Sequence, residues 1–161
     1  MKMHGRRWIR VASAVVLALT LGMTPVGLSA RAAEDAISIQ AARQVMTEFL
    51  RAFNGRDVEA LAATLMYPHV RIAAGGLVVF PDSEAFIAAT DMQAFAQRFD
   101  WNHSEWDAID VVQSGPGKVH FKVQFSRFDA RGQRNATFNS LYVVQQVDGR
   151  WGIRARSSFA P

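Results

Sequence analysis

The densest group of residues able to move protons lies in one segment, Trp101 to Asp107, which reads WNHSEWD. It combines two indoles with a histidine and two carboxylates, residue types that general acid–base catalysis uses. In a helix, His103 and Asp107 would share a face and could touch. In a strand they would lie roughly 13 Å apart, at about 3.3 Å per residue. We take His103 and Asp107 as candidate catalytic residues, with tryptophans that plug the domain interior and polar residues that cap a strand as the alternative.

Further polar residues could line a ligand pocket. His69 and Arg71 lie on the same side of a predicted strand, where one could move a proton and the other hold a carboxylate, unless that side is a solvated outer face. His120 could line a ligand or face outward. Arg154 and Arg156 could meet an anionic ligand or form the solvated side of the last strand, and for Arg156 the solvated side is favoured. The residues expected to line a pocket are Tyr67, His69, Arg71, Trp101, Trp106, His120, Tyr142 and Arg154.

Composition excludes several kinds of site. The chain has no cysteine, and the three histidines of residues 33–161 lack the spacings that bring metal ligands together, so we expect neither a metal nor a cofactor. Five of the 18 basic residues lie in the first 32 residues, which contain no acid. Residues 33–161 therefore carry 13 basic and 14 acidic residues, and nucleic-acid binding is not expected.

The N-terminus has the pattern of an export signal. A basic start, MKMHGRRWIR, precedes an apolar run from Val11 to Met23, and Ala30 and Ala32 fit the positions before a cleavage site. The run is shorter than the roughly 20 residues that span a bilayer. We expect residues 1–32 to be a cleaved signal peptide, residues 33–161 to form one domain without a membrane span, and the protein to reach a bacterial periplasm or the exterior.

Hydrophobic periodicity predicts helices in the first half of the mature chain. Residues 36–53 carry apolar residues at spacings of three and four, and a shorter helix follows with Asp57 as its cap. Tyr67-Pro68 is expected to end that second helix. A third helical region covers about 82–99, with a break or kink at Thr90-Asp91.

The remaining segments have the pattern of strands. A hairpin is predicted over 69–80, and four more strands follow it. The clearest begins at Val119, where apolar and polar residues alternate, and Asp148-Gly149 is a hairpin signal before the last strand. The four strands cover about 105–114, 119–126, 135–147 and 150–158.

Three segments resemble the NTF2-like superfamily, which includes SnoaL-like and ketosteroid-isomerase-like proteins. They are FLRAFNGRDVEALAATL, YPHVRI and the terminal SLYVVQQVDGRWGIRARSSF. The resemblance implies an α+β cone, in which three helices from the N-terminal half pack in a strongly curved, mainly antiparallel sheet of about six strands. It also implies a pocket, but the fold hosts many functions.

The resemblance leaves two functions open. Ketosteroid-isomerase-like members commonly carry a catalytic carboxylate on the first hairpin, but this chain has no acid between Glu59 and Asp82. We therefore expect an exported module that binds a small, largely apolar ligand or assembles as a homodimer. The alternative is a cofactor-free isomerase, dehydratase or hydrolase that uses His103, Asp107 or His69.

Overall fold

The computed structural model describes residues 26–161 and has four helices and six strands. The helices are α1 (Val26–Asn54), α2 (Val58–Ala63), α3 (Ser83–Ala88) and α4 (Met92–Phe99). The strands are β1 (Leu65–Ala73), β2 (Gly76–Phe80), β3 (His103–Gly115), β4 (Lys118–Phe128), β5 (Arg134–Val147) and β6 (Arg150–Ser158). This is the α+β order that the sequence predicts.

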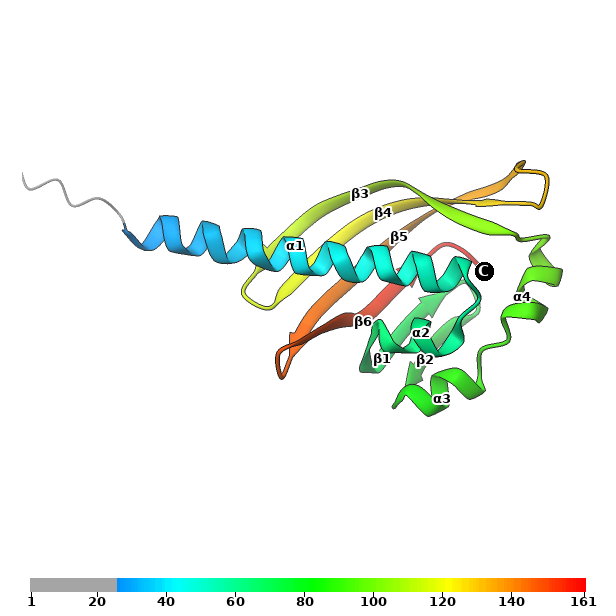
Figure 1. Cartoon of the computed structure of the whole chain (residues 1–161), viewed down its shortest axis with the longest axis horizontal. Coiled ribbons are helices and arrows are strands. Elements are labelled where there is room, and N and C mark those ends of the chain that lie inside the picture. Colours follow the sequence, from blue (N-terminus) through cyan, green and yellow to red (C-terminus); the bar gives the residue numbers. More distant parts are fainter. Residues whose placement is uncertain (1–25) are drawn as a thin grey trace, which may run out of the picture.

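The six strands form one sheet in the order β2-β1-β6-β5-β4-β3. Neighbouring strands are antiparallel except β1 and β6, which pair in parallel near the middle of the sheet. Figure 1 shows α1 crossing one face of the curved sheet, with α3 and α4 beyond its C-terminal end. The predicted cone, with helices packed in a curved and mainly antiparallel sheet, is confirmed.

The three short helices begin at aspartates that cap them. Asp57, Asp82 and Asp91 each accept hydrogen bonds from backbone N–H groups in the first turn of α2, α3 and α4. The cap at Asp91 explains why the predicted third helical region is two helices, separated at Thr90-Asp91. The second helix ends earlier than predicted, at Ala63, because the chain is already extended at Leu65.

The core forms between α1 and the inner face of the sheet. Ala42, Met46 and Phe49 of α1 are buried against a cluster that includes Phe121 and Tyr142. On β4, Val119, Phe121, Val123 and Phe125 are buried, while Lys122 and Gln124 between them are exposed. This alternation identifies the inner face of β4, which the sequence leaves open.

The predicted leader falls largely outside the described residues. Residues 1–25 are not described, and residues 26–32 form the beginning of α1. Cleavage after Ala32 and export therefore stay predictions. Among the described helices, none has the length and apolar character needed to cross a membrane.

Candidate functional site

A cavity of about 200 Å³ lies between the C-terminal part of α1, the helices α3 and α4, and the inner face of the sheet. Apolar side chains form much of its wall, among them Phe49, Leu50, Phe53, Phe86, Met92 and Phe95. An apolar cavity of roughly 150 Å³ is large enough for benzene. The cavity can therefore hold a ligand about the size of a substituted aromatic ring.

Three arginines on the sheet reach this cavity: Arg71 of β1, Arg127 of β4 and Arg156 of β6, which we call the arginine triad. The Nε atom of each is buried and has no hydrogen-bond partner in the described part of the chain. No carboxylate among residues 30–161 lies within ion-pair distance of any of the three. The triad thus places three uncompensated positive charges around a largely apolar space.

The charges of the triad influence one another. Burial lowers the pKa of Arg71, and the charge of Arg156 lowers it further. Burial also lowers the pKa of Arg127 to about 10, with Arg156 and Arg71 adding to the effect. Arg127 still keeps its charge at neutral pH, so the cavity wall is strongly positive.

Arg127 is the most enclosed member of the triad, with 5% of its surface exposed. Its guanidinium carbon lies 4.8 Å from the ring centre of Phe95, 5.0 Å from that of Phe99 and 4.9 Å from that of Phe138. These cation–π contacts partly replace the water that the charge has lost. They offer no oxygen acceptor, so the N–H groups of Arg127 gain no hydrogen bond from the rings.

His69 is a neutral group at the cavity. Its Nδ1 lies 2.8 Å from the carbonyl oxygen of Ile153, and because a carbonyl only accepts, Nδ1 carries the proton. Burial lowers the pKa of His69 to about 4, and the charges of Arg156 and Arg71 also lower it, against the effect of the hydrogen bond to Ile153. At neutral pH, Nε2 is therefore an unprotonated acceptor.

Two further polar groups of the lining are buried. Tyr142 is 1% exposed, and burial raises the pKa of its hydroxyl although the nearby Arg156 opposes the effect. The indole Nε1 of Trp106 is buried and has no hydrogen-bond partner among the described residues, although its ring packs against Phe49 and Tyr142. A buried indole N–H normally has an acceptor, so Trp106 adds an unused donor beside the triad.

Four of the eight residues expected to line a pocket lie at the cavity: His69, Arg71, Trp106 and Tyr142. The other four are elsewhere. Trp101 is buried among Phe53 and Phe95, and its Nε1 donates to Ser104. The side chain of His120 lies on the outer face of β4, because it alternates with the buried Val119 and Phe121.

Tyr67 and Arg154 hold the start of β1 in place instead of facing a ligand. The Tyr67 hydroxyl donates to the carbonyl oxygen of Ala62 at 3.1 Å, and the Arg154 guanidinium donates to the carbonyl oxygen of Tyr67. Arg154 and Tyr67 are therefore structural links between β6, β1 and α2.

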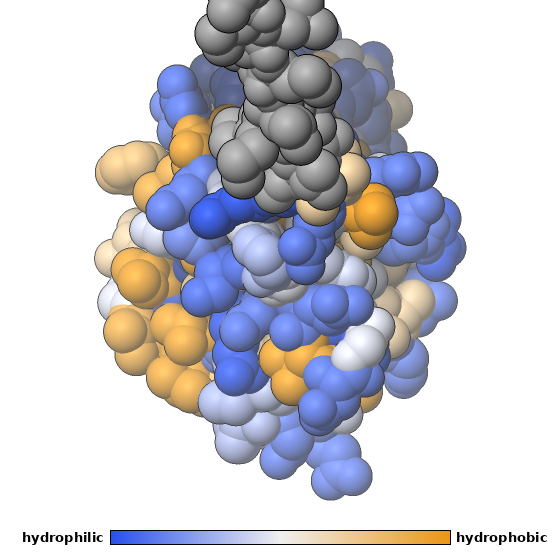
Figure 2. Space-filling view, turned by 90° about the vertical axis from the view of Figure 1, so that its left-hand side faces the viewer, coloured by the Kyte–Doolittle hydropathy of each residue, from blue (hydrophilic) through white to orange (hydrophobic). Residues whose placement is uncertain are grey.

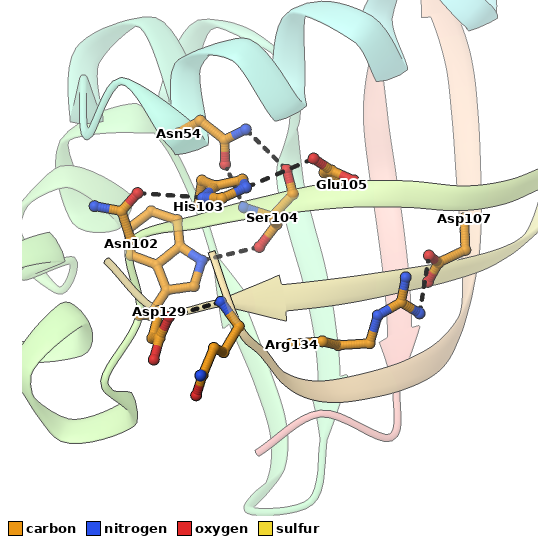
Figure 3. A network of polar contacts seen from close by, with 10 residues as sticks. Asn54, Asn102, His103, Ser104, Glu105, Asp107, Asp129 and Arg134 are labelled. Atoms are coloured by element: carbon orange, nitrogen blue, oxygen red, sulfur yellow. Dashed lines mark hydrogen bonds and ion pairs between the residues drawn. The ribbon is translucent and has the colours of Figure 1, made fainter. Parts of the chain in front are cut away.

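The structure does not bring His103 and Asp107 together. The segment is extended in β3, and His103 contacts Asn102 and Glu105, as Figure 3 shows. Asp107 instead accepts a hydrogen bond from Ser126 at 2.6 Å and pairs with Arg134 at 3.4 Å. Ser126 alternates with cavity residues of β4, so this cluster lies on the outer face.

Sequence reasoning missed Arg127 and favoured the solvated side for Arg156 over a contact with an anionic ligand, yet both line the cavity. A signal for Arg127 existed, because it continues the inward alternation that runs from Val119 to Phe125. Arg156 gave no such signal. A register irregularity between β5 and β6 lies at Val143/Val144, and it disturbs the alternation along β6.

The fold and cavity define a cone-shaped α+β protein, and sequence comparison gives its family. The family described as NTF2-like protein (DUF6841) matches residues 34–159. This chain belongs to that family of NTF2-like proteins. No curated protein sequence matches it significantly.

Solved structures share the fold at low sequence identity. A cystatin-like protein of unknown function from Nostoc punctiforme has a TM-score of 0.65 and 13% identity, with 78% of this chain and 92% of that chain covered. Aln2 from a Streptomyces species has a TM-score of 0.60 and 23% identity, covering 76% and 89%. A protein from Catenulispora acidiphila in complex with S-DNPA has a TM-score of 0.60 and 14% identity, covering 77% and 93%.

Proposed function

We propose that the chain is an exported binding protein that holds one small, largely apolar ligand in its cone cavity. The observation that carries the proposal is the cavity of about 200 Å³ with an aromatic and aliphatic wall. Burial of apolar ligand surface contributes roughly 25 cal/mol per Å². Export rests on the basic and apolar pattern of residues 1–32.

Native mass spectrometry of the protein purified from its own compartment tests both parts. The expected spectrum shows a chain that begins at Ala33 and a complex with one retained small molecule. Indole, a neutral aromatic probe, is then titrated into the ligand-free protein by calorimetry. A full-length chain without any ligand, together with no binding of indole, would contradict the proposal.

Two matched variants show whether the ligand occupies the cavity. Leu50→Trp fills the cavity from α1, because Leu50 belongs to its wall. Ile37→Trp introduces the same indole on α1 at a side chain that is 68% exposed and outside the cavity wall. Leu50→Trp should abolish the binding of indole and Ile37→Trp should leave it unchanged. Equal binding by both variants would place the ligand outside the cavity.

A second candidate is an acid–base enzyme, and His69 is the observation in its favour. Of the three residues considered for catalysis, His69 alone lines the cavity, and Ile153 fixes its tautomer. Its low pKa makes it a weak base at neutral pH. Cofactor-free turnover of a retained ligand that disappears in His69→Gln, with indole binding intact, would favour this function over simple binding.

Assembly as a homodimer is a separate part of the expectation. Figure 2 shows apolar residues gathered along one side of the molecule, and exposed apolar side chains of the sheet include Ile72, Val112 and Leu141. We propose a dimer formed through the sheet. Light scattering should give twice the monomer mass, and Leu141→Glu should halve it. A monomer at all concentrations would rule out the dimer without affecting ligand binding.

A further inference from the structure

We propose that the arginine triad is an anion site and that the ligand is a small organic acid, with an oxyanion head and a body about the size of one ring. This inference rests on the proposed function, because it names the ligand class of the same cavity. Three observations support it: the lack of counter-charges among the described residues, the arrangement of the donors and the apolar part of the cavity wall.

The first observation is that the triad lacks a counter-charge in the described part of the chain. Among the described residues of the cavity wall, Asp91 carries the only carboxylate. Its Oδ1 accepts from the backbone N–H groups of Gln93 and Ala94, at 3.0 and 2.8 Å, and no ion pair joins it to the triad among the described residues. A buried charge without a partner is strongly unfavourable. A bound anion removes that penalty for three charges together.

The second observation is the arrangement of donors. Arg71 and Arg156 are directly paired residues on neighbouring strands, and Tyr142 is the partner of Arg156 on the other side. Neighbouring strands lie about 4.8 Å apart, so the two guanidinium groups start from adjacent positions and can approach one oxyanion. Planar guanidinium groups match carboxylate and phosphate oxygens through paired hydrogen bonds.

Arg127 and Trp106 reach the same space from β4 and β3. Arg127 is at least nine-tenths buried, lines the cavity, and donates no hydrogen bond from its Nε to another described residue. The indole Nε1 of Trp106 is buried too, and no described residue offers it an acceptor. An oxyanion can accept from several N–H groups, so one head group accounts for the unused donors of both residues.

The third observation is the apolar part of the cavity wall. Phe86 of α3 and Met92 of α4 line the cavity from the short helices, beside Phe95, whose ring also contacts the guanidinium of Arg127. Since the cavity measures about 200 Å³, the triad and this wall leave room for one ring and a charged group. An inorganic ion would satisfy the triad but leave the apolar part unfilled.

Calorimetric titration of the full chain, as isolated and freed of ligand, tests the inference with four probes. Phenylacetate and phenyl phosphate carry the two oxyanion heads, phenylacetamide is the neutral match for phenylacetate, and inorganic phosphate is a head without a body. Because hydrogen bonds to a charged group are stronger than those to a neutral one, at least one aromatic anion should bind roughly tenfold or more tightly than phenylacetamide. The tighter of the two anions identifies the head group.

Variants connect the preference to the triad. Arg71→Gln, Arg127→Gln and Arg156→Gln should each weaken the binding of the preferred anion roughly tenfold or more, and should weaken the binding of phenylacetamide much less. Arg134→Gln is the matched control, because Arg134 pairs with Asp107 on the outer face. Circular dichroism verifies folding. Should the enclosed Arg127 be needed for folding, the less buried Arg71 and Arg156 still provide the test.

The outcomes separate this inference from the proposed function. Equal binding of phenylacetate, phenyl phosphate and phenylacetamide overturns the anion site. If the neutral probes still bind and Leu50→Trp abolishes their binding, the proposed function of binding an apolar ligand is supported without the anion site. Anion binding that all four arginine variants retain also overturns it. If inorganic phosphate binds as tightly as phenyl phosphate, the claim that the ligand carries an apolar part in this cavity is overturned. Loss of binding for every probe, indole included, contradicts the proposed function itself.

Discussion

Arg71 and Arg156 are direct partners in the parallel pairing of β1 with β6. Two positive side chains at paired positions repel each other, and like charges at such positions destabilise a sheet. No acidic side chain among the described residues lies within ion-pair distance of either arginine. The pair therefore lowers the stability of the protein when the cavity holds no anion.

The repulsion predicts that Arg71→Gln stabilises the ligand-free protein. The free energy of unfolding in low salt should rise by up to about 1 kcal/mol, because one of two facing charges is gone. Urea denaturation of both proteins measures the difference. Arg134→Gln, which removes an outer-face charge paired with Asp107, should give no such gain. A loss of stability in Arg71→Gln would mean that the pair is compensated within the protein.

His69 predicts a loss of stability in acid. Its folded pKa of about 4 lies below the unfolded value of 6.5, so the unfolded chain binds the proton more tightly. The contribution of His69 is complete above pH 6.5 and is lost as the pH falls towards 4. The full effect is about 3 kcal/mol. Urea denaturation across this range measures it, and His69→Gln should flatten the dependence. An unchanged slope in the variant would exclude His69 as the source.

The backbone of β1 lies too close to Gly152 to leave room for a side chain. A Cβ atom there would lie 3.0 Å from the backbone carbon of Leu65 and 3.1 Å from the backbone nitrogen of Met66. Gly152→Ala should therefore destabilise the protein by about 1–3 kcal/mol, since backbone atoms cannot move aside. Gly115→Ala is the matched control, because nothing lies within 4 Å of its added Cβ. Thermal denaturation compares them, and equal melting temperatures would contradict the close approach of β6 to β1.

The side-chain amide of Asn54 is expected to stabilise the fold by joining α1 to β3. It donates to the carbonyl oxygen of Ser104 and accepts from the N–H of Ser104, both at 2.9 Å, and so ties the end of α1 to β3. Asn54→Ala should lower the free energy of unfolding by about 1–3 kcal/mol, because both backbone groups lose their partner. Asn102→Ala removes only an exposed contact with His103 and should change it by less than about 0.5 kcal/mol. Urea denaturation distinguishes them; similar losses would refute the tie.

The fold could be predicted because its signals are local. The spacing of Ala42, Met46 and Phe49 predicts the buried face of α1, and the alternation from Val119 to Phe125 predicts a strand with one buried face. Such patterns depend only on neighbouring residues. The early end of α2 was missed, because the pairing of Leu65 with Ile153 is a long-range contact that overrides the local helical pattern.

The site was harder to predict because its residues meet only in three dimensions. Arg71 and Arg156 become neighbours through a parallel pairing of strands far apart in the chain, which no local pattern indicates. The segment from Trp101 to Asp107 was interpreted as catalytic because it contains a histidine and two carboxylates. Its extended conformation instead directs Trp106 to the cavity and Asp107 to the outer face.

Under the proposed binding function, the break at Thr90-Asp91 has a consequence for ligand preference. All three positive charges come from strands of the sheet, whereas Phe86 and Met92 of the cavity wall come from two short helices with independent aspartate caps. Phe95 differs from these two, because its ring lies against the guanidinium of Arg127. Substitutions at Phe86 or Met92 can therefore reshape the space for the uncharged part of a ligand while the strand pairing and the proposed attraction for negative charge are retained.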